Sequence, residues 1–422
     1  MNRARPLGLV SATALVVANM IGTGVFTTSG FLLRDLGSPW AVLLAWVGGG
    51  LLAALGAVSY GALARRFPES GGEYLFLART VHPAAGYVAG WISLLVGFAA
   101  PCAAVAFAFG EYVKGWWPGL APKVVGGVLL IFFSVVHSVG VRGGAWIQNT
   151  LVVAKILLIG AFVAFGWSHV RPAPPVALPG ASWTALGLAV VWVSFSYSGW
   201  NAAVYVGGEV AAPDQNLPRA LLLGTGIVTG LYLALHVVFL FAVPPEVLAG
   251  QLEVGRLAAG SLGGPRLAGG VTGLIALALA TSASSMIMAG PRVYARMAAD
   301  GCLPRWFATA AGPPRRAIAL QGAVALLLLW LSAYESLLTY IGFTLGLCAA
   351  GAVAGLMRLR RREGARLWVP GWPVVPALFV VAVAAVALAS ILRQPGPSAW
   401  GLITLGLPLV LWRLTARKAG GA

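Results

Sequence analysis

The feature that most constrains this chain is a succession of apolar stretches, each close to the length that crosses a lipid bilayer. A transmembrane helix needs about 20 predominantly apolar residues. We delimit twelve such stretches, at about 7–33, 40–64, 84–112, 123–141, 146–167, 184–210, 218–243, 266–290, 317–333, 336–357, 372–392 and 397–414. Only 9% of the residues are charged, against about 25% in a soluble domain. The sequence therefore predicts one all-α polytopic membrane domain over residues 1–422.

The distribution of basic residues predicts the orientation of these spans. An even number of spans places both termini on one side of the membrane. With this topology, 20 of the 28 lysines and arginines lie on the side of the termini, seven lie on the other side, and Lys155 lies inside a span. Cytoplasmic loops carry the excess of basic residues. We therefore expect a multi-pass protein of the cell membrane with both termini in the cytoplasm, and we do not read the net charge of +17 as a sign of nucleic-acid binding.

Two of the spans contain glycines at mid-depth, where a continuous helix is disfavoured. These are "MIGTGVF" (20–26), with Gly22 and Gly24, and "FSYSGWN" (195–201), with Gly199. Each glycine costs a helix about 1 kcal/mol relative to alanine. The two breaks begin successive sets of five spans, and breaks at matching positions of two halves indicate a transporter binding site built from inverted repeats. Close packing of helices through small residues is the alternative interpretation.

An unwound helix in a membrane leaves backbone groups that a ligand can satisfy. An unpaired amide or carbonyl in hydrocarbon costs several kcal/mol. The helix that restarts at Thr23, Gly24 and Val25 would offer amides and a positive dipole end to a carboxylate. The carbonyls at the breaks would suit an ammonium group: those of Met20, Ile21, Phe195 and Ser198. These breaks therefore predict a zwitterionic ligand.

Lys155 is a single cation at the centre of the fifth span, "LVVAKILLIGAFVAFG". A charge at this depth costs about 2.5 kcal/mol or more on insertion scales, and the nearer end of the span is too far for easy snorkelling. We expect its ammonium to face the bundle interior. Ser282 and Ser285, which share a face of the eighth span, are candidate partners, although serines in a membrane helix also bond their own backbone.

The sequence contains no pattern that indicates an enzyme, a metal site or a cofactor site. There is no Walker motif, no HExxH and no Ser–His–Asp pattern, and Cys102, Cys302 and Cys348 have no paired spacing. No acid lies deep in spans 1, 3, 6, 8 or 10, where a cationic substrate would need one. We therefore expect a transporter without catalytic residues, metal or cofactor. A channel would be the alternative of a different class.

Four motifs together resemble the amino acid–polyamine–organocation (APC) transporter superfamily, and most closely its L-type (LAT-like) branch. They are "MIGTGVF" (20–26), "FPESGGEY" (67–74), "FSYSGWN" (195–201) and "RVYARMAADGCLP" (292–304). The longer segment "ARRFPESGGEYLFLARTV" (64–81), between spans 2 and 3, is expected as a cytoplasmic re-entrant or surface helix. The resemblance implies the LeuT-like fold: 12 transmembrane helices, with a 5+5 inverted repeat whose helices 1 and 6 are discontinuous, plus two C-terminal helices. The repeats would cover about 7–167 and 184–357, and the extra helices about 372–414.

The resemblance also implies roles for individual residues. An α-amino acid would lie between the two breaks, with its carboxylate at Thr23 and Gly24 and with Phe195 as an aromatic gate over it. Asn201 and Tyr232 match polar residues that line the site or its inner gate. The implied substrate-binding set is Met20, Ile21, Gly22, Thr23, Gly24, Val25, Phe195, Ser198, Gly199 and Asn201. The implied coupling or gating set is Lys155, Ala18, Ser282, Ser285 and Tyr232.

The resemblance finally implies a mode of transport. Lys155 matches a lysine that occupies the place of a sodium ion in sodium-independent members, where it would bridge the Ala18 region to Ser282 or, second, Ser285. We expect sodium-independent transport or exchange of neutral L-amino acids by alternating access. Proton-coupled symport, with Lys155 carrying the proton, is the alternative, and a cationic amino acid or polyamine carrier is a weaker one. Animal members bond a single-span partner through a cysteine between spans 3 and 4. The loop "VKGWWPGLAP" has none, so we expect no disulfide-linked heavy chain.

Overall fold

The computed structural model describes the chain except for residues 1–6, 140–143, 172–181, 310–311 and 420–422. The regular secondary structure of the described part is helical, and one isolated bridge joins Leu7 and Val210. The first half contains α1 (Leu9–Met20), α2 (Gly24–Leu36), α3 (Pro39–Arg66), α4 (Gly72–Thr80), α5 (Pro83–Ile92), the π-helix η1 (Ser93–Ala99), α6 (Ala100–Lys114), α7 (Pro122–Val139) and α8 (Gly144–Trp167). The second half contains α9 (Trp183–Ser196), the 3₁₀-helix η2 (Ala202–Glu209), α10 (Pro213–Phe241), α11 (Pro245–Leu248), α12 (Val254–Ala299), η3 (Arg305–Phe307), α13 (Arg315–Leu331), α14 (Tyr334–Glu363), η4 (Gly364–Arg366), α15 (Val374–Arg393) and α16 (Pro395–Ala419).

Within the described residues, the twelve apolar stretches fall on helices or on interrupted helix pairs. Among the described residues, seven helices are individually long and apolar enough to cross a membrane. The pair α1 and α2, bent by 42° at its break, makes an eighth span if it is counted as one. The segments Val153–Trp167 and Trp183–Ser196 are apolar but shorter. The chain is therefore an all-helical, multi-pass membrane protein.

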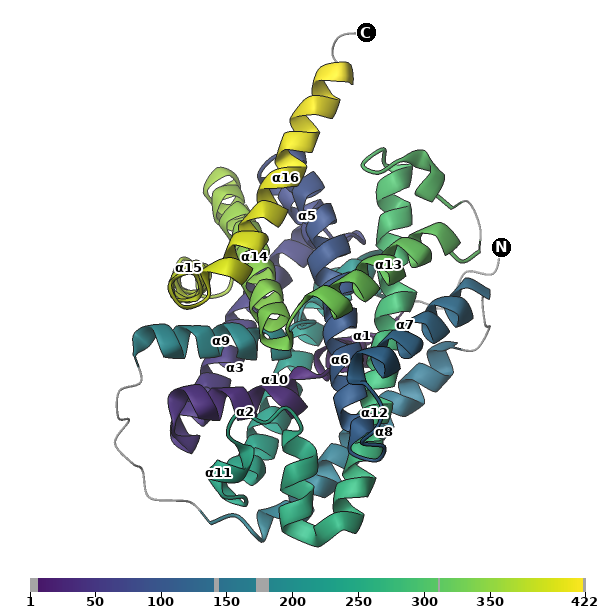
Figure 1. The fold of residues 1–422 in the computed structure, drawn as a ribbon. Helices are drawn as coiled ribbons and strands as arrows, with labels where there is room; N and C mark the ends of the chain where they lie inside the picture. The colour runs from purple at the N-terminus through teal and green to yellow at the C-terminus, as the bar shows by residue number, and fades with distance from the viewer. Residues whose placement is uncertain (1–6, 140–143, 172–181, 310–311, 420–422) are drawn as a thin grey trace.

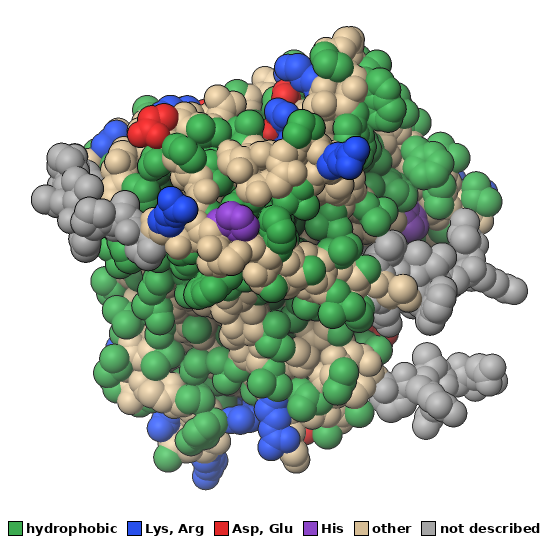
Figure 2. Space-filling model, turned by 90° about the horizontal axis from the view of Figure 1, so that it is seen from below, with side chains coloured by type: hydrophobic (Ala, Val, Ile, Leu, Met, Phe, Trp, Pro, Cys, Tyr) green, Lys and Arg blue, Asp and Glu red, His purple; other side chains and the backbone are tan. Residues whose placement is uncertain are grey.

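The outer surface of the bundle is apolar, as contact with lipid requires. Figure 2 shows a band of hydrophobic side chains between lysines and arginines that lie near the upper and lower margins of this face. Large side chains such as Phe132, Leu157, Val381 and Leu407 are more than half exposed. Monomeric soluble proteins rarely expose contiguous apolar patches of this kind, so this surface fits a bilayer.

Each end of α14 carries an ion pair. The two residues of each pair lie on the same predicted side of the membrane, and the two pairs lie on opposite sides. At the start of α14, Glu335 pairs with Arg34 at the end of α2, with an Nη2–Oε2 distance of 2.9 Å. At its other end, Glu363 pairs with Arg66 at the end of α3, with an Nη2–Oε1 distance of 3.0 Å. Thus α14 crosses the bundle from one charged rim to the other.

The interrupted helices lie inside the bundle, where they are covered by long helices. α1 packs against α10, and α2 packs against α9. α9 also packs against α3, α14 and α15. This enclosure explains how the breaks are tolerated, since irregular backbone at membrane depth persists only where protein or a cavity surrounds it.

Candidate functional site

The two predicted interruptions are present, and they pack against each other. α1 ends at Met20 and α2 begins at Gly24, while α9 ends at Ser196 ahead of the 3₁₀-helix η2. A Cβ atom on Gly24 would lie 2.6 Å from the Cα atom of Ser196. Gly199 has a φ of 98°, and a Cβ atom there would lie 2.7 Å from the backbone carbonyl oxygen of Asn19. Both glycines are therefore required by close contact between the breaks.

The start of α2 has buried backbone amides at the first break. The amide of Phe26 donates to the carbonyl of Thr23 at 2.9 Å. The amides of Thr23, Gly24 and Val25 have no backbone acceptor among the described residues, and no side chain caps this end of α2. Three free N–H groups at the positive end of a helix dipole form a site that is suited to a carboxylate.

Tyr232 of α10 holds the carbonyls of both breaks. Its fully buried hydroxyl lies 2.6 Å from the carbonyl oxygen of Met20 and 3.2 Å from that of Ser196. These are the last residues of α1 and α9, and the single hydroxyl proton is shared between carbonyls that both unwound segments leave open. The carbonyl of Met20, which the sequence assigned to the substrate amine, thus already accepts a hydrogen bond from the protein.

Lys155 links the first break to α12. Its side chain is 6% exposed, and its Nζ lies 3.4 Å from the carbonyl oxygen of Ile21 and 3.2 Å from Oγ of Ser282. Ser282 is one of the two predicted serines, and its own hydroxyl lies 2.9 Å from the carbonyl oxygen of Ala278. Ser282 thus bonds both the Lys155 ammonium and the backbone of its own helix, which are the two roles considered for it. The acceptor on the first span is Ile21 rather than Ala18, because the break leaves the Ile21 carbonyl without a helical partner.

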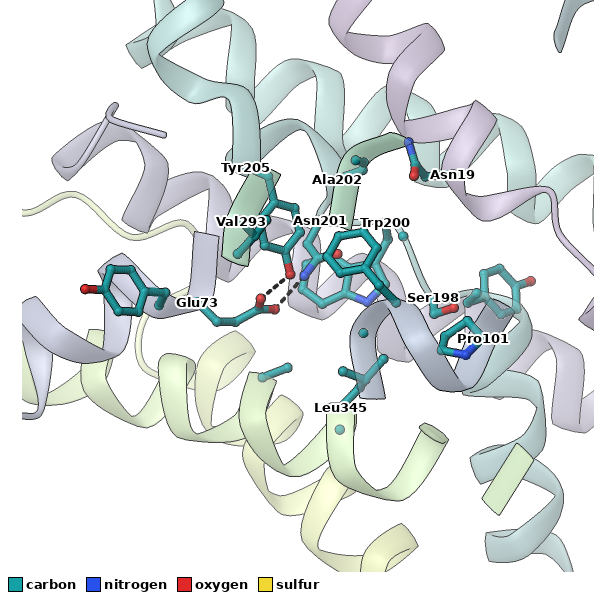
Figure 3. Close-up of a pocket in the computed structure, with 18 of the residues that line it drawn as sticks. Asn19, Glu73, Pro101, Ser198, Trp200, Asn201, Ala202, Tyr205, Val293 and Leu345 are labelled. Atoms are coloured by element: carbon teal, nitrogen blue, oxygen red, sulfur yellow. Dashed lines mark hydrogen bonds between the residues drawn. The ribbon is translucent and has the colours of Figure 1, made fainter. Parts of the chain in front are cut away.

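A cavity of about 1320 Å³ opens beside the second break. Four of the predicted substrate residues line it: Phe195, Ser198, Gly199 and Asn201. Figure 3 shows Ser198 and Asn201, together with Asn19 from the first break. The cavity continues past Arg79, Arg292 and Asp300, on the side that the sequence assigned to the cytoplasm. Residues 20–25 are not in its wall, because the segment Met20–Val25 lies behind the cavity against α9 and α10.

A family model described as "Amino acid permease" matches residues 7–412. The chain belongs to the amino acid permease family. This agrees with the resemblance to the APC superfamily, and it makes the chain a transporter and not an enzyme. The match covers both breaks, Lys155 and every residue of the predicted site.

Curated relatives of this permease are amino acid transporters of low sequence identity. It is 27% identical to the Asc-type amino acid transporter 1 of Mus musculus, over 97% of this chain and 82% of the relative. It is 28% identical to the serine/threonine exchanger SteT of Bacillus subtilis (strain 168), over 89% of each. It is also 28% identical to the large neutral amino acids transporter small subunit 2 of Oryctolagus cuniculus, over 85% of this chain and 70% of that one.

Glu73 is a residue of the permease cavity that the sequence analysis did not single out. It lies on α4, it is only 8% exposed, and it lines the cavity. Its carboxylate accepts hydrogen bonds from Tyr60 of α3 at 3.0 Å, from Asn201 at 2.5 Å, and from Tyr205 of η2. The segment expected as a re-entrant or surface helix is therefore inserted between α3 and η2. Asn201 and Tyr205 lie 128 and 132 residues from Glu73 in the sequence, so the motif "FPESGGEY" was the one sequence feature that pointed to this residue.

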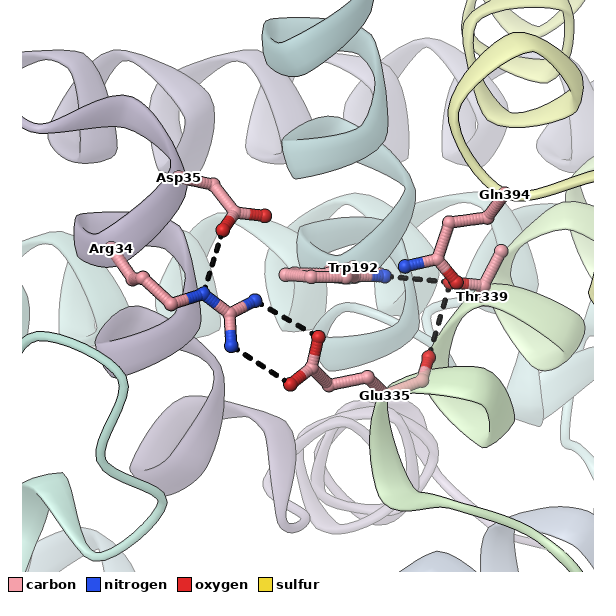
Figure 4. Close-up of polar contacts among 6 residues, drawn as sticks. All are labelled: Arg34, Asp35, Trp192, Glu335, Thr339 and Gln394. Atoms are coloured by element: carbon pink, nitrogen blue, oxygen red, sulfur yellow. Dashed lines mark hydrogen bonds and ion pairs between the residues drawn. The ribbon is translucent and has the colours of Figure 1, made fainter.

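The opposite end of the permease is tied together by charged and polar side chains, as Figure 4 shows. Arg34 donates to both carboxylate oxygens of Glu335, at 3.0 and 2.9 Å, and to Asp35 at 2.8 Å. Trp192 of α9 donates to Thr339 of α14 at 2.8 Å. None of these residues lines the cavity. The cavity thus opens toward one side, and α2, α9 and α14 are joined at the other.

Proposed function

We propose that this permease is a sodium-independent exchanger of neutral L-amino acids that works by alternating access. The observation that carries the proposal is the group of unpaired amides at Thr23, Gly24 and Val25. They lie at a break that packs directly against the second break, whose residues line the cavity. Residues 20–25 lie behind the cavity wall in this conformation, so we propose that the first break moves into the cavity during the transport cycle and presents these donors to a carboxylate.

The remaining groups of the site suit an α-ammonium group and an uncharged side chain. The carbonyls of Met20 and Ile21 accept from Tyr232 and Lys155, but a carbonyl oxygen has two lone pairs and can accept a second bond. Phe195 lines the cavity and would cover the bound amino acid. The carboxylate of Glu73 accepts from three neutral donors that hold it to α3 and η2, and we assign it to joining these helices rather than to binding substrate. A neutral substrate, rather than a cationic amino acid or a polyamine, is favoured by the relatives named for serine and threonine and for large neutral amino acids.

Sodium independence is supported by the position of Lys155. Its ammonium lies between the carbonyl of Ile21 and the hydroxyl of Ser282, both of which are oxygen ligands of the type that hard cations prefer. A fixed positive charge at that point repels a second cation strongly in a medium of low dielectric constant. The lysine thus supplies the link between α1 and α12 that a bound ion would otherwise supply.

The proposed architecture is the LeuT-like arrangement of twelve transmembrane helices. Its repeats would cover about residues 7–167 and 184–357, with extra helices at about 372–414, as one domain with both termini in the cytoplasm. In this arrangement the cavity faces inward, and the Arg34–Glu335 pair belongs to the closed outer gate. We also propose that no heavy chain is disulfide-linked to this permease, because the connection between α6 and α7 contains no cysteine.

Competition in proteoliposomes tests the recognition of both ends of the substrate. We expect unlabelled neutral L-amino acids to inhibit the uptake of labelled L-serine or L-leucine, whereas their methyl esters, which lack the carboxylate, do not. Lysine and putrescine should compete poorly. Competition by methyl esters equal to that of the parent amino acids would show that the amides at Thr23, Gly24 and Val25 do not bind a carboxylate.

A further inference from the structure

The C-terminal turns of α14 carry the basic run "RLRRRE", residues 358–363. Some of its side chains contact neighbouring elements, and the others are exposed. Arg360 lies over the ring of Trp372, with its Cζ atom 5.6 Å from the ring centroid. Glu363, the acid in this run, pairs with Arg66 of α3. These side chains hold α14 to its neighbours. The other three arginines face outward.

Arg358, Arg361 and Arg362 are exposed and have no acidic partner in the described part of the chain. Arg358 makes one long contact, at 3.4 Å, with the carbonyl oxygen of Val81. The three arginines follow Ala354 and Met357 at helical spacing, so all five residues share one face of α14. Together they line a surface cleft of about 410 Å³.

The depth of this cleft places it where the hydrocarbon of a bilayer meets the headgroups. α14 begins at Tyr334, next to the charged rim formed by Arg34 and Glu335. Ala354 follows 20 residues later, which corresponds to about 30 Å of helix and so to the thickness of the hydrocarbon core. Ala354 and Met357 therefore lie at the inner boundary of the core, and the three arginines lie one to two turns beyond it.

We propose that this cleft binds the headgroup of an anionic membrane phospholipid. The phosphate would lie between Arg361 and Arg362, with Arg358 at its edge, and the first part of an acyl chain would run along Met357 and Ala354. Guanidinium groups match phosphate oxygens in bidentate geometry, and clusters of basic residues immediately cytoplasmic of a transmembrane helix recognise such headgroups. The apolar half of the cleft favours a lipid over free phosphate. The inference depends on the proposed topology but not on the transported substrate.

Native mass spectrometry of the purified, detergent-solubilised full chain tests the proposal. Titration with phosphatidylglycerol should give adducts at a several-fold lower lipid concentration than titration with phosphatidylcholine. The double variant Arg361→Gln/Arg362→Gln should weaken the association of phosphatidylglycerol at least about fivefold. The matched control is Arg219→Gln/Arg305→Gln, which removes two exposed arginines on the same predicted side but away from α14, and it should change the association less than about twofold.

Three results would overturn the proposal. One is equal association of phosphatidylglycerol and phosphatidylcholine with the unmodified permease. Another is an equal loss in the two double variants, because the effect would then come from overall surface charge. The third is displacement of the lipid by millimolar inorganic phosphate, which would identify free phosphate as the ligand. All substituted residues are exposed, and monodisperse elution of each variant checks that it is folded.

Discussion

Lys155 joins the interrupted first span to α12 through a single ammonium group, and this contact carries our first prediction. Lys155→Ala removes the hydrogen bonds to Ile21 and Ser282 and leaves a carbonyl without that donor inside the membrane, which costs about 1–3 kcal/mol. We expect transport efficiency to fall about tenfold or more, as measured by kcat/KM in proteoliposomes. Lys123→Ala, at a half-buried lysine whose Nζ donates to the carbonyl oxygen of Trp330 at 3.0 Å, is the control. Unchanged affinity and turnover in Lys155→Ala would refute this role.

Tyr232 gives a second test at the residue scale, because a single hydroxyl serves both breaks. Tyr232→Phe keeps the ring, which packs edge-on against Trp46 with centroids 5.5 Å apart, and removes only the bonds to Met20 and Ser196. We expect kcat to fall about tenfold with little change in protein yield, since a lost buried hydrogen bond costs about 1–3 kcal/mol. Tyr340→Phe removes a hydroxyl that bonds only Thr404 among the described residues, and it should have a small effect. Equal effects of the two variants would contradict the assignment.

Glu73 connects α4 to α3 and η2 through three hydrogen bonds. Substitution of Glu73 therefore tests whether this network supports stability and transport. Glu73→Gln preserves the shape of the side chain but replaces an acceptor oxygen by an NH₂ donor. At least one of Tyr60, Asn201 and Tyr205 then loses its acceptor, and we expect a lower melting temperature and several-fold slower transport. Glu69→Gln, at an exposed acid of the same segment that pairs only loosely with Arg79 at 3.6 Å, is the control. A Glu73→Gln variant as stable and as active as Glu69→Gln would show that the network has no such role.

At the scale of elements, the breaks in α1–α2 and α9–η2 form one unit, because each contains a glycine that the other requires. Gly24→Ala would place a methyl group 2.6 Å from the Cα atom of Ser196, whereas at Gly22 the nearest atom would be 3.9 Å away. We expect Gly24→Ala to destabilise the fold by about 1–3 kcal/mol and to abolish transport. Gly22→Ala, which adds the same methyl group two residues earlier, should retain most activity. Thermal unfolding in detergent and transport assays compare the two, and similar behaviour would argue against contact between the breaks.

The elements of this fold could be predicted from sequence to different degrees, for physical reasons. Apolar stretches became helices because hydropathy and length are local properties, and the breaks at Gly24 and Gly199 were visible because glycine disfavours a helix. The contact of Lys155 with Ser282 followed from the high cost of an unpaired charge in the membrane. The burial of Glu73 could not be predicted, since its donors come from segments up to 132 residues away. The hydrogen bond from Tyr232 to the Met20 carbonyl could not be predicted either, because it depends on how α10 packs.

At the scale of the whole molecule, the structure has one open side and one closed side. The cavity reaches Arg79 and Arg292, while the Arg34–Glu335 pair and the contacts of Trp192 join the helices at the opposite end. Transport by alternating access requires the reverse arrangement as well, so the contacts of the closed end must break in each cycle. The wall of the cavity excludes Met20–Val25 in this conformation, which is why the predicted substrate residues are only partly exposed to it.

Countertransport is the most direct test of exchange of neutral amino acids without sodium. Proteoliposomes that contain the purified permease are loaded with unlabelled L-serine or left empty, and the uptake of labelled L-serine is measured with sodium or with choline outside. We expect uptake to be strongly stimulated by internal amino acid, equal in sodium and choline, and independent of an imposed pH gradient. Uptake into empty vesicles that is driven by a sodium or proton gradient, without stimulation by internal substrate, would contradict the proposed mechanism.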